Sequence, residues 1–204
     1  LYMPVSLPAF DWKACLRGSS MDMTTMILSA LLPDIPNMDM LVKKAYTGKF
    51  ETDHLTPTVS VGDFGVLELF RGPTSAFKDV ALSMLPQLLT AAKAEKGMEK
   101  DILILTATSG DTGKAALEGF HDVDGIKICV FYPYGGVSQV QRAQMVTQEG
   151  NNVAVCALHG NFDDCQTGVK NVFAACRDKA LPFKLSSANS INIGRLAPQI
   201  MYYF

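Results

Sequence analysis

The chain has 204 residues, enough for one domain or for a domain with a small appendage. A hydrophobic content of 48% provides for a substantial core and excludes a wholly disordered chain. The net charge is −2 and no block of like charge runs along the chain, so nothing indicates a nucleic-acid or membrane-surface partner. The longest apolar runs have the length of a strand and are too short to span a bilayer.

Two short helical patterns open the chain and predict a small helical appendage. The first is "SMDMTTMILSALL", for which Ser20 is the expected N-cap. The second is "NMDMLVKKAYTG", which follows a proline, has Asn37 as the expected N-cap and ends at Gly48.

After Pro57 the pattern changes to an alternation of strands and helices. Strands are predicted at 58–61, 65–70, 101–107, 126–132 and 152–158, and helices at 76–96, 111–121, 137–148, 162–180 and from about 191. This alternation predicts an α/β fold, with a parallel sheet covered by helices on both faces. Pro86 is expected to kink the helix at 76–96.

Lys78 lies in "GPTSAFKDVAL", among small and apolar residues, at the joint between a strand and a helix. With Ser75 as N-cap, Lys78 would stand in the first helical turn, where the helix dipole disfavours a positive charge. Apolar neighbours also favour the neutral amine, and a readily deprotonated lysine suits Schiff-base chemistry. A solvated helix lysine is the alternative interpretation.

The joint "TATSGDTGKAAL" places hydroxyl side chains and glycines between an apolar strand and a helix. Backbone N–H groups at such a helix start suit a small anion such as a carboxylate or phosphate. A P-loop would need glycine at Thr108 and a hydroxyl residue at Ala115, so this segment is not a P-loop. A turn that only caps the helix is the alternative.

The five cysteines are odd in number and show no C-x-x-C spacing, which is typical of reduced thiols in a cytosolic protein. The histidines His54, His121 and His159 are scattered without metal-ligand spacing, so no metal site is predicted.

Several longer segments together resemble threonine synthase, one of the fold-type II pyridoxal-phosphate enzymes, whose fold is that of the tryptophan synthase β subunit. They are "LYMP" (1–4), "GPTSAFKDVAL" (72–82), "TATSGDTGKAAL" (106–117), "VSQVQRAQM" (137–145), "GNFDDCQTGVKNVF" (160–173) and "SSANSINIGRLAPQIMYY" (186–203). The resemblance implies that residues 1–56 form the small N-terminal region of such an enzyme and residues 57–204 part of its catalytic domain. The family's glycine-rich loop for the cofactor phosphate follows the last of these segments. The chain is therefore expected to be a fragment of a longer chain, and inactive alone.

The resemblance also implies roles for individual residues. Lys78 stands where the family's lysine forms a Schiff base with pyridoxal phosphate, and Asp111 stands where many relatives carry an asparagine beside the cofactor's ring hydroxyl. The loop that grips the substrate carboxylate is matched by Thr108, Ser109, Asp111 and Thr112. We expect the substrate phosphate near Asn189, Ser190, Asn192 and Arg195, because arginine can chelate a phosphate with two hydrogen bonds. The segments 137–145 and 160–173 receive no chemical role.

The implied activity is the conversion of O-phospho-L-homoserine and water to L-threonine and phosphate. Two alternatives stay open: a related phospho-lyase that gives 2-oxobutyrate, ammonia and phosphate, and a truncated domain without catalytic activity.

Overall fold

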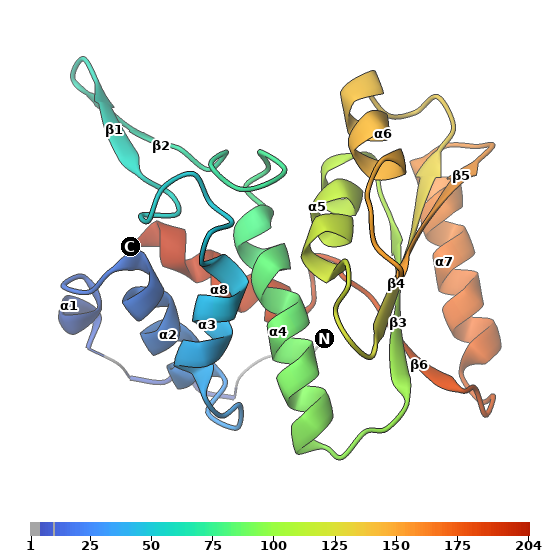
Figure 1. Ribbon diagram of the computed structural model, residues 1–204, viewed down its shortest axis with the longest axis horizontal. Helices are drawn as coiled ribbons and strands as arrows, with labels where there is room; N and C mark the ends of the chain where they lie inside the picture. The colour runs from blue at the N-terminus through green and yellow to red at the C-terminus, as the bar shows by residue number, and fades with distance from the viewer. Residues whose placement is uncertain (1–4, 10) are drawn as a thin grey trace. The chain divides into compact units, whose positions relative to one another are not determined.

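The computed structural model describes residues 5–9 and 11–204 (Figure 1). The segment "LYMP" lies outside the described residues. The chain divides into two compact units, one formed by Leu1–Lys96 with Ser190–Phe204 and the other by Gly97–Asn189. The predicted boundary at residue 56 falls inside the first unit, and the assignment of separate functional regions to either side of it stays a prediction.

The first unit is mainly helical. Its helices are α1 (Trp12–Cys15), α2 (Ser20–Leu31), α3 (Met38–Tyr46), α4 (Asp79–Glu95), α8 (Ile193–Gln199) and the 3₁₀ helix η1 (Ile200–Tyr203). Both predicted N-terminal helices are present. The N-cap of α2 is Ser19 and not Ser20, because Ser19 and Asp22 exchange hydrogen bonds in a capping box. Helix α4 continues through Pro86 to Glu95.

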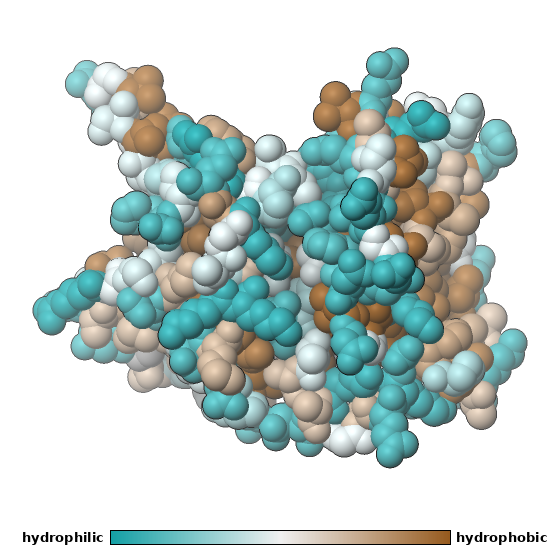
Figure 2. Space-filling view, in the orientation of Figure 1, coloured by the Kyte–Doolittle hydropathy of each residue, from teal (hydrophilic) through white to brown (hydrophobic). Residues whose placement is uncertain are grey.

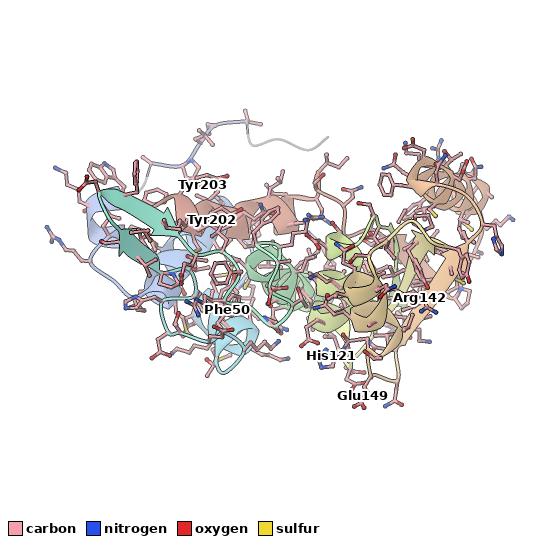
Figure 3. All side chains as sticks on the ribbon, turned by 90° about the horizontal axis from the view of Figure 1, so that it is seen from above. Phe50, His121, Arg142, Glu149, Tyr202 and Tyr203 are labelled. Atoms are coloured by element: carbon pink, nitrogen blue, oxygen red, sulfur yellow. The ribbon has the colours of Figure 1, made fainter. Side chains whose placement is uncertain are left out.

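One apolar core holds the first unit together. Buried side chains from α2, α3, α4 and η1 meet in it, among them Ile27, Val42, Met84 and Met201. The hydroxyl of the buried Tyr46 donates a hydrogen bond of 2.8 Å to the carbonyl of Val80, which ties α3 to the first turns of α4. The C-terminal aromatic residues Tyr202 and Tyr203 lie together on η1, with ring centroids 4.9 Å apart (Figure 3).

The predicted strands at 58–61 and 65–70 do not join the parallel sheet. They form β1 (Thr58–Val61) and β2 (Phe64–Leu67), an antiparallel hairpin in which Val61 pairs with Phe64. The two residues between the strands begin with Gly62 at φ 60, and such a short loop can connect only antiparallel strands. The hairpin carries exposed apolar side chains, which Figure 2 shows on its surface.

The second unit contains the parallel sheet. Its strands β3 (Asp101–Ala107), β4 (Ile126–Pro133), β5 (Val153–Leu158) and β6 (Phe183–Ser186) are all parallel, in the order β5-β4-β3-β6. Helices α5 (Asp111–Phe120) and α7 (Phe162–Cys176) lie on opposite sides of this sheet (Figure 1), and α6 (Gln139–Val146) packs beside α5. The predicted α/β fold with helices on both faces is confirmed.

Strand β6 is the one element of the sheet that the sequence pattern does not predict. Its four residues are at most partly buried and show no strong apolar alternation, but they pair with β3 from Asp101 to Ile104. Among the described residues, no helix is both long and apolar enough to cross a bilayer.

Candidate functional site

Lys78 is placed at the start of α4. It is the N-cap residue of the helix, with φ −67 and ψ −17, and its carbonyl accepts the N–H of Leu82 at 2.8 Å. The prediction that Ser75 caps the helix is wrong, because Ser75 takes a left-handed conformation with φ 57 in the preceding turn. Lys78 therefore stands at the edge of the helix and not inside its first turn.

The loop before Lys78 is held by the buried carboxylate of Asp79, which is only 2% exposed. Asp79 accepts hydrogen bonds from the N–H of Thr74 at 2.8 Å, the hydroxyl of Thr74 at 2.6 Å and the N–H of Ala76 at 3.4 Å. A Cβ at Gly72 would lie 2.5 Å from the Cβ of Asp79, so only glycine fits there. The backbone before Lys78 is therefore held by the hydrogen bonds to Asp79 and by the close approach of Gly72 to the same side chain.

Two electrostatic influences on Lys78 oppose one another. Its Nζ lies 4.4 Å from the centroid of the Phe77 ring, and the face of an aromatic ring attracts a cation. The N-terminus of α4 carries a partial positive charge, which disfavours the cation. Lys78 is half-buried, and the aromatic contact is an addition that the sequence pattern did not indicate. A reactive role for Lys78 stays a prediction.

In the second unit, the predicted anion loop connects β3 to α5. Thr108 is 1% exposed, and its hydroxyl oxygen accepts the N–H groups of Gly110 at 3.0 Å and Gly113 at 2.9 Å. The side chain of Thr108 thus accepts the backbone N–H groups of the turn, as the capping alternative expects. Ser109 is exposed and Thr112 is half-buried. A role for these residues in binding a substrate stays a prediction.

Asp111 begins α5 and contacts two side chains of the same unit. Its Oδ1 accepts a hydrogen bond of 2.8 Å from Nε2 of Gln141, and Nζ of Lys114 lies 3.7 Å from the same oxygen. Lys114 is almost fully buried, at 8% exposed. The structure thus joins Asp111 to α6, a contact that the sequence analysis missed. The pattern Ser138-x-x-Gln141 is a capping-box signal that could have drawn attention to Gln141.

The segment "NSINIGR" passes from one unit to the other. Asn189 is the last residue of the second unit, and Ser190 opens the return of the chain to the first; both are exposed. Asn192 is the N-cap of α8 and accepts the N–H of Gly194 at 2.9 Å. Arg195 is 5% exposed, and burial lowers the pKa of its guanidinium. A shared role for these residues stays a prediction.

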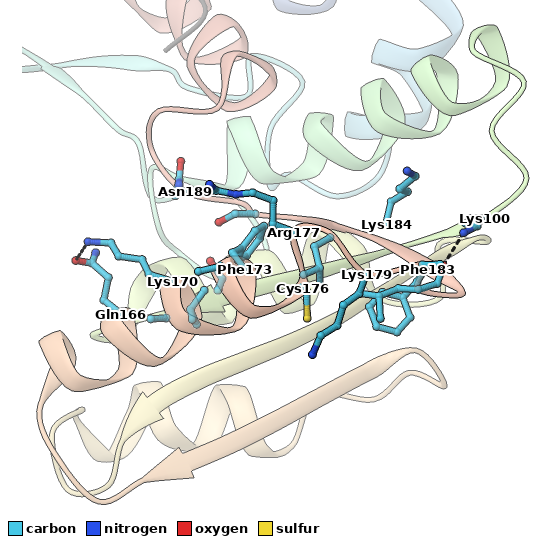
Figure 4. A pocket seen from close by; sticks show the side chains of 18 residues that line it. Lys100, Gln166, Lys170, Phe173, Cys176, Arg177, Lys179, Phe183, Lys184 and Asn189 are labelled. Atoms are coloured by element: carbon cyan, nitrogen blue, oxygen red, sulfur yellow. Dashed lines mark hydrogen bonds between the residues drawn. The ribbon is translucent and has the colours of Figure 1, made fainter.

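The second unit also contains a cavity of about 750 Å³ between α7, β3 and β6 (Figure 4). Its lining includes Asn189 and five basic side chains, namely Lys100, Lys170, Arg177, Lys179 and Lys184. These cations do not converge on one point. Lys100 donates to the carbonyl of Leu181 and Lys170 to Gln166, whereas Lys179 and Lys184 point in opposite directions in Figure 4. The part of the chain that the structure describes holds no group of three His, Cys, Asp or Glu side chains placed for a metal ion.

Comparisons with known proteins agree with the resemblance seen in the sequence. No protein-family model matches the chain. Threonine synthase from Pseudomonas aeruginosa is 39% identical over 213 residues, which cover the whole chain and 44% of the relative. The Escherichia coli threonine synthase is 38% identical over 211 residues and is covered to 46%. The crystal structure of pyridoxal-phosphate-bound threonine synthase from Brucella melitensis superposes on the whole chain with a TM-score of 0.85 at 38% identity, and 44% of it is covered.

The chain thus spans less than half the length of the curated relatives it matches, and it matches their N-terminal part. These matches confirm the predicted resemblance to threonine synthase and the predicted fold class.

Proposed function

We propose that the chain functions in a pyridoxal-phosphate-dependent enzyme of threonine biosynthesis, because the whole chain matches the N-terminal part of threonine synthases in sequence and in fold. The proposed reaction converts O-phospho-L-homoserine and water to L-threonine and phosphate. The observation that carries the proposal is the placement of Lys78 at the start of α4, in a loop fixed by a buried carboxylate. A cytosolic location stays a prediction.

The residues of the first unit fit this cofactor. Pyridoxal phosphate needs a primary amine held on a rigid support, and Lys78 offers one next to the buried Asp79. When bound, the cofactor supplies an electron sink that makes the protons of the substrate acidic. Lys78 would hold the cofactor through its Nζ. Once the substrate amine has taken its place, the neutral Nζ of Lys78 would remove the proton from the substrate's α-carbon.

The start of α5 supports binding of the substrate carboxylate. The N–H groups of the first turn and the positive end of the helix dipole attract an anion, and the exposed hydroxyl of Ser109 is a further donor. The half-buried hydroxyl of Thr112 stands in the same turn. In this proposal Thr108 shapes the loop, and Asp111 faces the ring hydroxyl of the cofactor.

Arg195 is proposed to bind the substrate phosphate, with Asn189, Ser190 and Asn192 nearby in the chain. Burial of the charged Arg195 guanidinium, which is 5% exposed, costs free energy, and for the same reason burial lowers its pKa. A phosphate dianion would offset the cost through two parallel hydrogen bonds. Loss of a β-proton would expel this phosphate from the γ-carbon. Protonation at the γ-carbon, addition of water at the β-carbon and return of a proton to the α-carbon then complete the proposed reaction.

The first test is chemical labelling. The chain, joined to the C-terminal remainder of the Escherichia coli threonine synthase, is incubated with pyridoxal phosphate, reduced with borohydride and mapped by peptide mass spectrometry. We expect the reduced cofactor on Lys78, and its loss in Lys78→Ala but not in Lys93→Ala, a lysine in the last turn of the same helix. Equal labelling of Lys78→Ala and the unchanged protein would contradict the proposal.

The second test identifies the products from O-phospho-L-homoserine. Threonine and phosphate in equal amounts are expected. Formation of 2-oxobutyrate and ammonia would identify a phospho-lyase instead. Absence of both labelling and turnover in a folded protein would leave the non-catalytic domain as the better interpretation.

A further inference from the structure

Gln141 lies in the segment "VSQVQRAQM", for which the sequence pattern gave no chemical role. In the structure it is the residue of α6 that reaches Asp111 at the start of α5, with Nε2 and Oδ1 2.8 Å apart. A contact from a separate helix to a proposed cofactor residue suggests a function beyond packing.

The orientation of the Gln141 amide is set by its other hydrogen bond. Its Oε1 accepts the backbone N–H of Ser138 at 3.2 Å, and a backbone N–H can only donate. The Nε2 of Gln141 is therefore the atom that faces Asp111, and it can only donate. The Oδ1 of Asp111 must therefore accept, and the ammonium of Lys114 lies 3.7 Å from the same oxygen.

The backbone of the loop is shaped around this amide. Gly110 has φ 144, and a Cβ on it would lie 2.4 Å from Cδ and from Nε2 of Gln141. The Gln141 amide therefore lies directly against the turn that begins α5. A side chain at position 110 would exclude it.

Helix α6 is anchored firmly enough to hold the amide in place. Its N-terminus is closed by a capping box between Ser138 and Gln141. One helical turn further along, Met145 is fully buried, and its Sδ would lie 3.0 Å from a Cβ at Gly113. Gln141 and Met145 thus face α5 from the same side of α6, as residues four apart do.

We propose that Gln141 is a positioning residue, which fixes the orientation of Asp111 toward the bound cofactor. This inference rests on the proposed function. Gln141 does not itself touch the reacting atoms; it acts through Asp111.

A matched control lies two residues beyond the end of α6. Gln148 donates from Nε2 to Oε2 of Glu118 at 3.2 Å, again to a carboxylate on α5, but at the other end of α5. A purely structural link between the helices predicts similar effects from Gln141→Ala and Gln148→Ala. A positioning role predicts that only Gln141→Ala changes the site.

The experiment uses the completed protein described above, loaded with pyridoxal phosphate. We expect Gln141→Ala to lower kcat/KM by about 10- to 100-fold and to shift the absorbance band of the bound cofactor, because small misplacements of a site residue are costly. Gln141→Glu, which sets carboxylate against carboxylate, should be worse although its shape is nearly the same. Gln148→Ala should leave the band in place.

A second readout needs no cofactor. Urea midpoints are measured for Gln141→Ala, Asp111→Ala and the double variant, and the double variant should lose less than the two single losses added together. Strictly additive losses would overturn the inference. So would normal Lys78 labelling together with an unchanged absorbance band and kcat/KM in Gln141→Ala. A third outcome is that Lys78 is not labelled but the losses in urea midpoint are less than additive. It would reject the proposed function and leave the link from Gln141 to Asp111 standing.

Discussion

The buried carboxylate of Asp79 gives the sharpest prediction about stability. Asp79→Ala removes the acceptor of two short hydrogen bonds, from the N–H of Thr74 at 2.8 Å and from its hydroxyl at 2.6 Å. A hydrogen bond to a charged group contributes roughly 1.5–3 kcal/mol, and the bond to Ala76 at 3.4 Å adds little. We therefore expect the free energy of unfolding to fall by about 3–5 kcal/mol.

Asp79→Asn should be much milder. The asparagine oxygen can still accept the two backbone N–H groups, and its NH₂ can donate to the hydroxyl oxygen of Thr74 once that hydroxyl rotates. The loss should be about 1–2 kcal/mol, because neutral hydrogen bonds replace charge-assisted ones.

Urea denaturation followed by circular dichroism measures both losses. Asp39→Ala is the control. Asp39 is exposed and lies 4.0 Å from Lys43 in a weak surface pair, so this variant should lower the free energy of unfolding by less than about 0.5 kcal/mol. Labelling of Lys78 should weaken in parallel with the loss of loop structure. The reasoning is refuted if Asp79→Ala unfolds within about 1 kcal/mol of the unchanged chain, or if Asp79→Asn is as damaging.

The further predictions concern Cys129, Asn192 and two glycines. Burial, with Cys156 as a smaller cause, raises the pKa of the Cys129 thiol to about 11 from 9.0. Above pH 9 the unfolded chain thus binds fewer protons than the folded one, so this thiol's contribution to stability is lost as pH rises from 9 to 11. Mass spectrometry should then show iodoacetamide modifying Cys129 at pH 8 far more slowly than the exposed Cys156. Asn192→Ala should cost about 1 kcal/mol as a lost N-cap, and Asn192→Ser should restore the unfolding midpoint; a full loss with serine would argue against the cap. Gly113→Ala should cost about 1–3 kcal/mol, since a Cβ would lie 2.5 Å from a buried threonine methyl. Gly168→Ala, where a Cβ meets nothing within 4 Å, should instead stabilise α7 by about 0.5–1 kcal/mol in the same urea assay.

Much of the fold follows from local signals in the sequence. The strand at 101–107 and the starts of α5 at Asp111 and α7 at Phe162 agree with the predicted positions. An unbroken apolar run, a glycine-bearing turn and a capping residue act within a few residues of one another, so the printed sequence contains all that these elements need. The hypothesis that Lys78 is a reactive lysine likewise rests on its immediate neighbours in the sequence.

Other features depend on residues that are distant in the chain. Strand β6 has little apolar pattern of its own and exists because the edge of β3 offers backbone partners. The hairpin of β1 and β2 was assigned to the wrong sheet, because an apolar strand pattern does not say which strand it pairs with.

The candidate site shows the same division. The sequence by itself determined which residues are proposed to bear the chemistry: a lysine before a helix, hydroxyls and an aspartate at a helix start, and an arginine near the end. Only the tertiary structure decided how they are held. Asp79 is buried, and Asp111 accepts a hydrogen bond from Gln141, thirty residues away on another helix. A hydrogen bond like that of Gln141 to Asp111 forms only when the chain brings separate elements together.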